Sequence, residues 1–150
     1  MASDWSAVAP AIADVKARVA AAAGPGQTVR LVAVSKIKPA AAVRAGYDGG
    51  QRYFGENYAK ELLEKATSDE LAGLDDLRWH FIGHLQSNKA NTLVKRTPRL
   101  ACVETVDSAK LASKLDAAVA AALVSGQRPA AMGSLDIFLH PRPLLTTTHA

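Results

Sequence analysis

Blocks of apolar residues with strand-like and helix-like spacing follow one another in regular order along this chain. The apolar runs predict strands over residues 30 to 35, 53 to 56, 78 to 83 and 100 to 104, with residues 135 to 139 open to pairing as a fifth. Outside these runs, apolar residues at helical spacing predict five helices: residues 4 to 22, Pro39 to Gly49, Asn57 through Lys65, Ser87 or Asn88 to about Lys95, and Ser108 to about Leu123. A further short turn of helix is expected at residues 69 to 75. Asp4, Asn57 and Asp107 are the expected helix caps.

This strand–helix alternation predicts an α/β fold with parallel strands. Polar side chains recur where the strands end, and the carboxyl edge of a parallel sheet is where ligands bind. The helices that follow also point their N-termini at that edge, where their amides favour anions. The residues concerned are Ser35 and Lys36, Glu56 and Asn57, Gly83, His84 and Gln86, and Glu104 and Thr105.

Lys36 is the most informative of these residues, because it ends the apolar run that begins at Leu31. A lysine at the end of a buried strand has a charge that is hard to solvate, which favours the neutral, nucleophilic amine. The chemical interpretation is a lysine that forms a Schiff base with a carbonyl compound. The alternative is a strand-end lysine whose ammonium group reaches water.

Four further residues are candidates for the same site, each with a structural alternative. His80 lies within a strand and can face a flat ring, or it is a hydrogen-bonded core histidine. Asn57 can bond a ligand oxygen or cap a helix, and Gly83 can admit a ligand or mark a tight turn. Glu56 can orient Lys36, or form a salt bridge at the strand end. No metal site is expected, because His80 and His84 stand across a strand and its exit with no third ligand nearby.

Composition narrows the class of protein. The chain has 150 residues, a formal net charge of +4 and a single cysteine, Cys102. The scattered basic residues suit a small anionic ligand and do not form a nucleic-acid stripe. One cysteine allows no internal disulfide, and we expect Cys102 to be an inert core residue. The sequence shows neither a secretory signal nor an apolar run long enough to span a bilayer. We therefore expect a cytoplasmic protein and leave open a second pool in an organelle.

Four segments, in order, resemble the pyridoxal phosphate homeostasis proteins. They are Leu31-Val-Ala-Val-Ser-Lys36 with Lys38-Pro39, Gly50-Gln-Arg-Tyr-Phe-Gly-Glu-Asn57-Tyr58, Trp79-His-Phe-Ile-Gly-His-Leu-Gln-Ser-Asn-Lys89, and Glu104-Thr-Val-Asp-Ser108 with Lys110-Leu111. The resemblance implies a (β/α) barrel like the N-terminal domain of alanine racemase. It also implies pyridoxal 5'-phosphate held as a Schiff base on Lys36, with Asn57, His80 and Gly83 around the cofactor.

The implied role is intracellular homeostasis of vitamin B6 rather than turnover of a substrate. Three alternatives stay open: a pyridoxal phosphate enzyme such as an amino-acid racemase, an aldolase that forms a Schiff base without a cofactor, and an inactive remnant. Racemisation needs an acid and a base on opposite faces of the substrate, and neither Tyr53 nor Tyr58 is clearly placed as the second group.

The chain departs from the family after about residue 124. A complete barrel of this kind needs about 250 residues, whereas about four or five strand–helix units are expected here. The resemblance also implies a small-residue phosphate cradle and an arginine at the pyridine nitrogen, and neither is found. We therefore expect a partial TIM barrel over residues 1–124, a divergent and poorly ordered tail over 125–150, and a truncated product. From this truncation we expect weak retention of the cofactor. We also expect a monomer, or weak self-association through strands that lack a neighbour.

Overall fold

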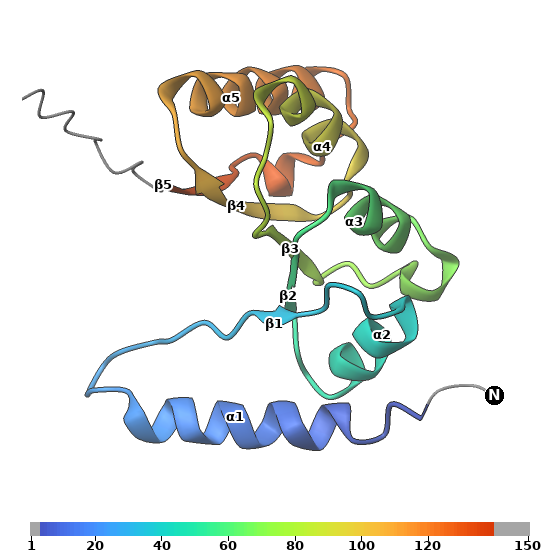
Figure 1. Cartoon of the computed structure of the whole chain (residues 1–150), viewed down its shortest axis with the longest axis vertical. Coiled ribbons are helices and arrows are strands. Elements are labelled where there is room, and N and C mark those ends of the chain that lie inside the picture. The colour runs from blue at the N-terminus through green and yellow to red at the C-terminus, as the bar shows by residue number, and fades with distance from the viewer. Residues whose placement is uncertain (1–3, 140–150) are drawn as a thin grey trace, which may run out of the picture.

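The computed structural model describes residues 4–139, which contain one parallel sheet of five strands in the order β1-β2-β3-β4-β5 (Figure 1). The strands are β1 (Ala33–Val34), β2 (Tyr53–Glu56), β3 (Arg78–Phe81), β4 (Leu100–Val106) and β5 (Asp136–Leu139). All four neighbouring pairs are parallel. The predicted strand–helix alternation and the fifth strand are therefore confirmed.

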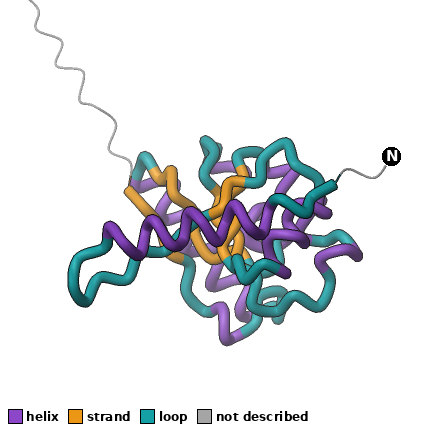
Figure 2. The backbone as a smooth tube through the Cα atoms, turned by 90° about the horizontal axis from the view of Figure 1, so that it is seen from below, coloured by secondary structure: helices purple, strands orange, loops and turns teal. Residues whose placement is uncertain are grey.

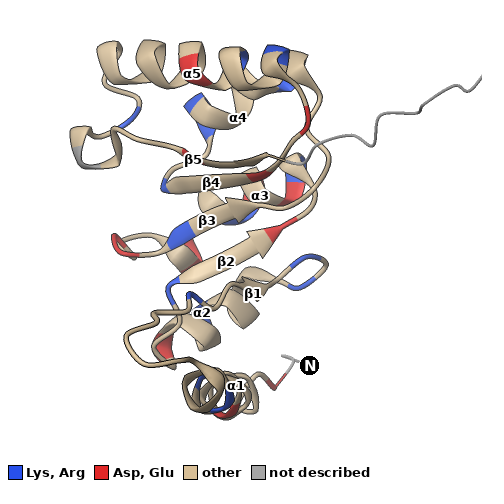
Figure 3. Cartoon of the chain, turned by 90° about the vertical axis from the view of Figure 1, so that its left-hand side faces the viewer, with Lys and Arg blue, Asp and Glu red and all other residues tan. Residues whose placement is uncertain are grey.

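A helix or a short turn of helix precedes or follows every strand. The helices are α1 (Val8–Ala22), α2 (Ala40–Asp48), α3 (Ala59–Ala66), α4 (Ala90–Arg96) and α5 (Ala109–Val124), with 3₁₀ turns at Asp69–Leu71, Ser87–Lys89 and Ala130–Met132. Helices α2 to α5 cover one side of the sheet, whereas α1 lies beyond α2 and crosses that end of the molecule (Figures 2 and 3). Among the described helices, none has both the length and the hydropathy that a bilayer span requires.

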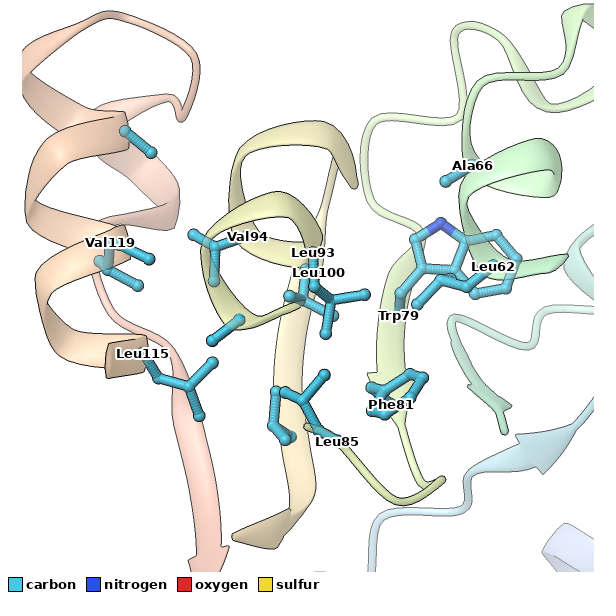
Figure 4. Close-up of a cluster of buried hydrophobic side chains, with 14 of the residues drawn as sticks. Leu62, Ala66, Trp79, Phe81, Leu85, Leu93, Val94, Leu100, Leu115 and Val119 are labelled. Carbon is cyan, nitrogen blue, oxygen red and sulfur yellow. The ribbon is translucent and has the colours of Figure 1, made fainter. Parts of the chain in front are cut away.

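The core lies between the sheet and helices α2 to α5. Phe54, Trp79 and Phe81 point to this side from β2 and β3, and all three are almost fully buried. They pack near Leu62 of α3, and the same layer continues to Leu115 of α5 (Figure 4). Burying such side chains contributes roughly 1.5–3 kcal/mol each, so this outer layer holds the sheet to its helices.

The opposite, inner face of the sheet is curved. A flat five-stranded sheet would separate its edge strands by about 19 Å. Yet Arg30, just before β1, places its Nη1 3.9 Å from Oδ2 of Asp136 in β5. The sheet therefore curls toward its inner face, as the wall of a barrel does.

Several element boundaries differ from the sequence-based expectation: β3 ends two residues earlier, at Phe81, and β4 two residues later, at Val106. Three other differences have a clear physical reason. Helix α1 begins at Val8 rather than at residue 4, because Oδ1 of Asp4 accepts a hydrogen bond from the Ser6 amide in a turn ahead of the helix. Strand β1 has two residues instead of six, because only β2 pairs with it and no strand of the described residues lies on its other side. Helix α5 is capped by Ser108, whose Oγ accepts from the Leu111 amide, and not by Asp107.

The expected boundary at residue 124 coincides with the end of α5. Beyond it, Arg128 is buried and donates hydrogen bonds to the carbonyl oxygens of Leu100, Met132 and Ser134. These bonds connect the segment ahead of β5 to β4. The expected tail is thus described only to residue 139, and its residues 140–150 lie outside the described part of the chain.

Candidate functional site

Strand register arranges the inner face in layers. Val34 of β1 lies beside Gly55 of β2, and Gly55 lies beside His80 of β3. Beyond Val34 the pairing continues to Ser35, whose amide donates to the Gly55 carbonyl oxygen over 2.9 Å, and Lys36 follows in a turn. Lys36 and Asn57 thus stand at the exits of neighbouring strands, and His80 lies within β3.

Lys36 is exposed, so the prediction that its charge is hard to solvate is wrong. The reason is the short, uncovered β1, in which Val34 is 55% exposed on the inner face. Lys36 instead occupies a tight turn in which the Lys38 amide donates to the Ser35 carbonyl oxygen over 3.0 Å. The next residue, Ile37, has a φ of 59°, a conformation that β-branched residues rarely adopt.

His80 is the buried polar centre of the inner face. Its side chain is 2% exposed, and its Nδ1 lies 2.6 Å from Oε1 of Glu104. The ring of Tyr53 meets the imidazole edge-on at 5.7 Å between centroids. Nε2 of His80 is buried and has no hydrogen-bond partner among the described residues. An orphaned ring nitrogen of this kind is the feature expected where a bound molecule supplies the missing partner.

Sequence reasoning did not place Arg30, Tyr53, Cys102 and Glu104 around His80, and of these four it singled out all but Arg30 for other reasons. The Arg30 guanidinium lies 4.6 Å from the centre of the Tyr53 ring, and Glu104 and Cys102 approach from β4. Burial, helped by the charges of Glu104 and Asp136, raises the pKa of the Cys102 thiol to about 12. Cys102 is therefore a poor nucleophile, as its sequence context suggested. The signal for Arg30 was available, since it shares the two-residue alternation of Val32, Val34 and Lys36.

His80, Cys102 and Glu104 hold potential metal-ligand atoms within 4.8 Å of one another. Two ligand atoms on one tetrahedral zinc ion lie about 3.3 Å apart. The 2.6 Å between Nδ1 of His80 and Oε1 of Glu104 is instead the length of a hydrogen bond. This geometry favours a fixed histidine ring over a metal centre.

Asn57 is not a helix cap, because α3 begins after Tyr58 and no side chain caps its N-terminus. Its backbone lies against Gly83, where a Cβ atom would stand 1.9 Å from the Asn57 carbonyl oxygen. Oγ1 of Thr105 donates a hydrogen bond to the Gly83 carbonyl oxygen. Gly83 thus admits a neighbouring backbone segment, which links the exits of β2, β3 and β4.

One large hollow does not lie at this edge. It has a volume of about 620 Å³ and is lined by residues such as Lys16, Arg30 and Gln51, at the amino ends of β1 and β2. A hollow of about 380 Å³ lies at the carboxyl edge, between the exit of β3 and the N-terminus of α5, and is lined by Ser87, Asp107 and Ser108. A further hollow of about 490 Å³ lies against the turn that carries Lys36 and is lined by residues such as Ile37, Lys38 and Lys65.

Curated relatives agree in their descriptions. The pyridoxal phosphate homeostasis protein of Bos taurus is 53% identical over 95 residues, which cover 63% of this chain and 34% of the relative. The protein of that name from Pseudomonas aeruginosa is 45% identical over 138 residues, which cover 89% of this chain and 54% of the relative. The Escherichia coli K12 protein is 35% identical over 136 residues, covering 88% and 53%. The chain thus spans roughly a third to a half of the length of these relatives. No protein-family model matches it.

Solved structures give the same answer for the fold. PipY of Synechococcus elongatus, the COG0325 family member described with pyridoxal phosphate bound, superposes with a TM-score of 0.63 at 40% identity over 76% of this chain and 49% of PipY. Fold and site together define a partial (β/α) barrel with a lysine at the carboxyl edge of its first strand. The chain is a relative of the pyridoxal phosphate homeostasis proteins, the family that its four sequence segments resemble.

Proposed function

We propose that this chain binds pyridoxal 5'-phosphate through a Schiff base on Lys36 and takes part in the intracellular homeostasis of vitamin B6 without catalysing a reaction of its own. The observation that supports the proposal is the buried His80 on the inner face, whose Nε2 has no hydrogen-bond partner among the described residues, in the same sheet whose neighbouring strand exits carry Lys36 and Asn57. The relatives' names describe homeostasis of this cofactor, and PipY is described with the cofactor bound.

The residues of the inner face suit such a molecule. Lys36 supplies the amine, and its exposure makes that amine accessible to a dissolved aldehyde. Asn57 is free of a capping role and supplies amide donors and an acceptor beside the amine. His80, held by Glu104, supplies a flat ring whose buried Nε2 has no hydrogen-bond partner among the described residues. When bound, the cofactor supplies a reactive aldehyde, which the lysine holds reversibly.

Gly83 contributes through the backbone in this proposal. Because Gly83 has no side chain, the exits of β2 and β3 lie against each other, and this contact positions the backbone of Asn57. For the phosphate group we propose the hollow at the N-terminus of α5, where backbone amides face the same edge. Few charged donors line that hollow, so we expect the cofactor to be retained weakly.

Reductive trapping tests the proposal. The protein is incubated with pyridoxal phosphate, reduced with borohydride and digested, and the modified peptides are mapped by mass spectrometry. We expect label at Lys36 at least about tenfold above Lys38, which is equally exposed and lies in the same turn. Lys36→Ala should abolish the main label, whereas Lys38→Ala should leave it unchanged. Equal labelling of the two lysines in the unmodified chain would refute the proposal.

The racemase alternative is tested with the same protein. Tyr58 is 57% exposed and Tyr53 contacts His80 with the edge of its ring, so neither is an evident partner base for Lys36. We expect no exchange of an amino acid α-proton with solvent deuterium after loading with cofactor. Exchange that depends on Lys36 would replace the homeostasis proposal with an enzymatic one. We further propose a cytoplasmic location, consistent with the single, unpaired Cys102.

A further inference from the structure

A buried charged network stands on the outer side of the sheet, directly behind the turn that carries Lys36. Oε1 of Glu56 accepts hydrogen bonds from Ser35 Oγ at 2.6 Å and from Lys65 Nζ at 2.7 Å. Nζ of Lys65 also donates to the Ser35 carbonyl oxygen at 2.7 Å and to Oε1 of Glu61 at 2.6 Å. The Glu56 side chain is fully buried, and that of Lys65 is 7% exposed.

This network is not explained by stability alone. Taking an ammonium and a carboxylate out of water costs as much as their attraction returns, so apolar residues of similar size serve a core equally well. Lys65 nevertheless donates all three protons of its ammonium group. One acceptor is the Ser35 carbonyl oxygen, and another is the Glu56 carboxylate, which also accepts from the Ser35 hydroxyl. The network therefore fixes one residue, Ser35, at both its side chain and its backbone.

Ser35 is the first residue of the tight turn that carries Lys36. Its carbonyl oxygen accepts from the Lys38 amide and, on its other side, from Lys65. Lys36 and Ile37 are the two central residues of this turn, and Ile37 holds a φ of 59° although its side chain is 77% exposed. An exposed isoleucine has no packing to impose that conformation. Strain of this kind persists only where the surroundings determine the backbone.

We propose that Lys65 and Glu56 are positioning residues that hold the Ser35–Lys38 turn in its strained form, so that the amine of Lys36 projects over the inner face toward Asn57. This inference rests on the proposed function of Lys36. Without the two bonds to Ser35, the turn relaxes to a negative φ at Ile37 and the amine no longer projects toward Asn57. Lys65 and Glu56 act only through Ser35.

The test compares Lys65→Met with Lys60→Met. Lys60 lies on the same helix and is 90% exposed, with a loose contact of 3.8 Å to Glu64. Two readouts are taken on folded protein: the rate of Schiff-base formation with pyridoxal phosphate, and the ratio of Lys36 to Lys38 modification by reductive methylation, which needs no cofactor. For Lys65→Met we expect the rate to fall at least about tenfold and the methylation ratio to approach that of unfolded peptide. Lys60→Met should match the unmodified protein in both.

Two milder variants carry the test if Lys65→Met does not fold. Ser35→Ala removes the hydroxyl that Glu56 holds, and Ile37→Gly removes the strain without touching a charge. We expect Ser35→Ala to slow Schiff-base formation severalfold and to lower the methylation ratio. Ile37→Gly adopts the same positive φ without strain, so it should raise the melting temperature and keep the ratio of the unmodified protein. Folded Lys65→Met, or Ser35→Ala where Lys65→Met does not fold, with an unchanged ratio and rate would overturn the positioning role.

The two proposals fail in distinguishable ways. If the unmodified chain shows no preferential labelling of Lys36 by pyridoxal phosphate, the cofactor proposal fails. The methylation ratio still reports whether Lys65 and Glu56 control the turn. If the cofactor labels Lys36 selectively in both the unmodified chain and Lys65→Met, only the positioning role fails.

Discussion

Gly83→Ala is the substitution that most directly connects the packing of the strand exits to the site. A methyl group at residue 83 would lie 1.9 Å from the carbonyl oxygen of Asn57 and 2.7 Å from its carbonyl carbon. Both atoms belong to the backbone, so no side-chain rotation relieves the contact. The two segments must separate by about 1 Å before the carbon–oxygen distance reaches an acceptable value. The hydrogen bond from Thr105 to the Gly83 carbonyl oxygen opposes that movement from β4.

We expect Gly83→Ala to lower the free energy of unfolding by about 2–3 kcal/mol, the upper part of the range for overpacked positions. For a chain of this size, that loss corresponds to a fall in melting temperature of roughly 5–10 °C. Because Asn57 moves with the strand exit, trapping of pyridoxal phosphate at Lys36 should fall at the same time. Chemical denaturation and borohydride trapping measure the two effects.

Gly24→Ala is the matched control. There the nearest atom to a new methyl group is Oε1 of Gln27 at 3.3 Å, the end of a flexible side chain. We expect a change of less than about 0.5 kcal/mol, or a small gain from the reduced freedom of the unfolded chain. If Gly83→Ala stays within about 0.5 kcal/mol of the unmodified protein, the close approach of the strand exits does not hold in solution.

Two further predictions concern β4 and β5. Burial raises the pKa of the Cys102 thiol from 9.0 to about 12, so its stabilising contribution is complete below pH 9 and is lost as the pH rises toward 12. Alkaline denaturation curves should therefore show a slope steeper by up to about 1.4 kcal/mol per pH unit than those of Cys102→Ala, and parallel curves would contradict the burial of the thiol. Arg128→Met leaves the carbonyl oxygens of Leu100 and Ser134 without their donor, and we expect a loss of about 1–3 kcal/mol for the buried Leu100 group. Hydrogen exchange should then accelerate in Asp136–Leu139 but not in β2 and β3, and retained protection of β5 would show that Arg128 does not hold it.

Local patterns in the sequence were sufficient for the order of the elements. The alternation of apolar runs and helical spacing predicted the parallel sheet, and β2 was predicted with its exact bounds because Tyr53–Glu56 lies between clear turn residues. The salt bridge at the end of β2 was also among the alternatives considered for Glu56. The site residues Lys36, Asn57, His80 and Gly83 were selected from the strand ends, and their cofactor roles stay predictions.

Chain sequence alone thus determined which residues stand at the carboxyl edge, because side-chain alternation and strand ends are local properties. Only the tertiary structure decided how each residue is solvated and held. Lys36 is exposed because β1 is a short edge strand, and His80 is buried because β4 brings Glu104 against it. Lys65 is charged yet buried because α3 places it behind Ser35, thirty residues away in sequence. Burial and pairing depend on which segments pack together, and no local pattern contains that information.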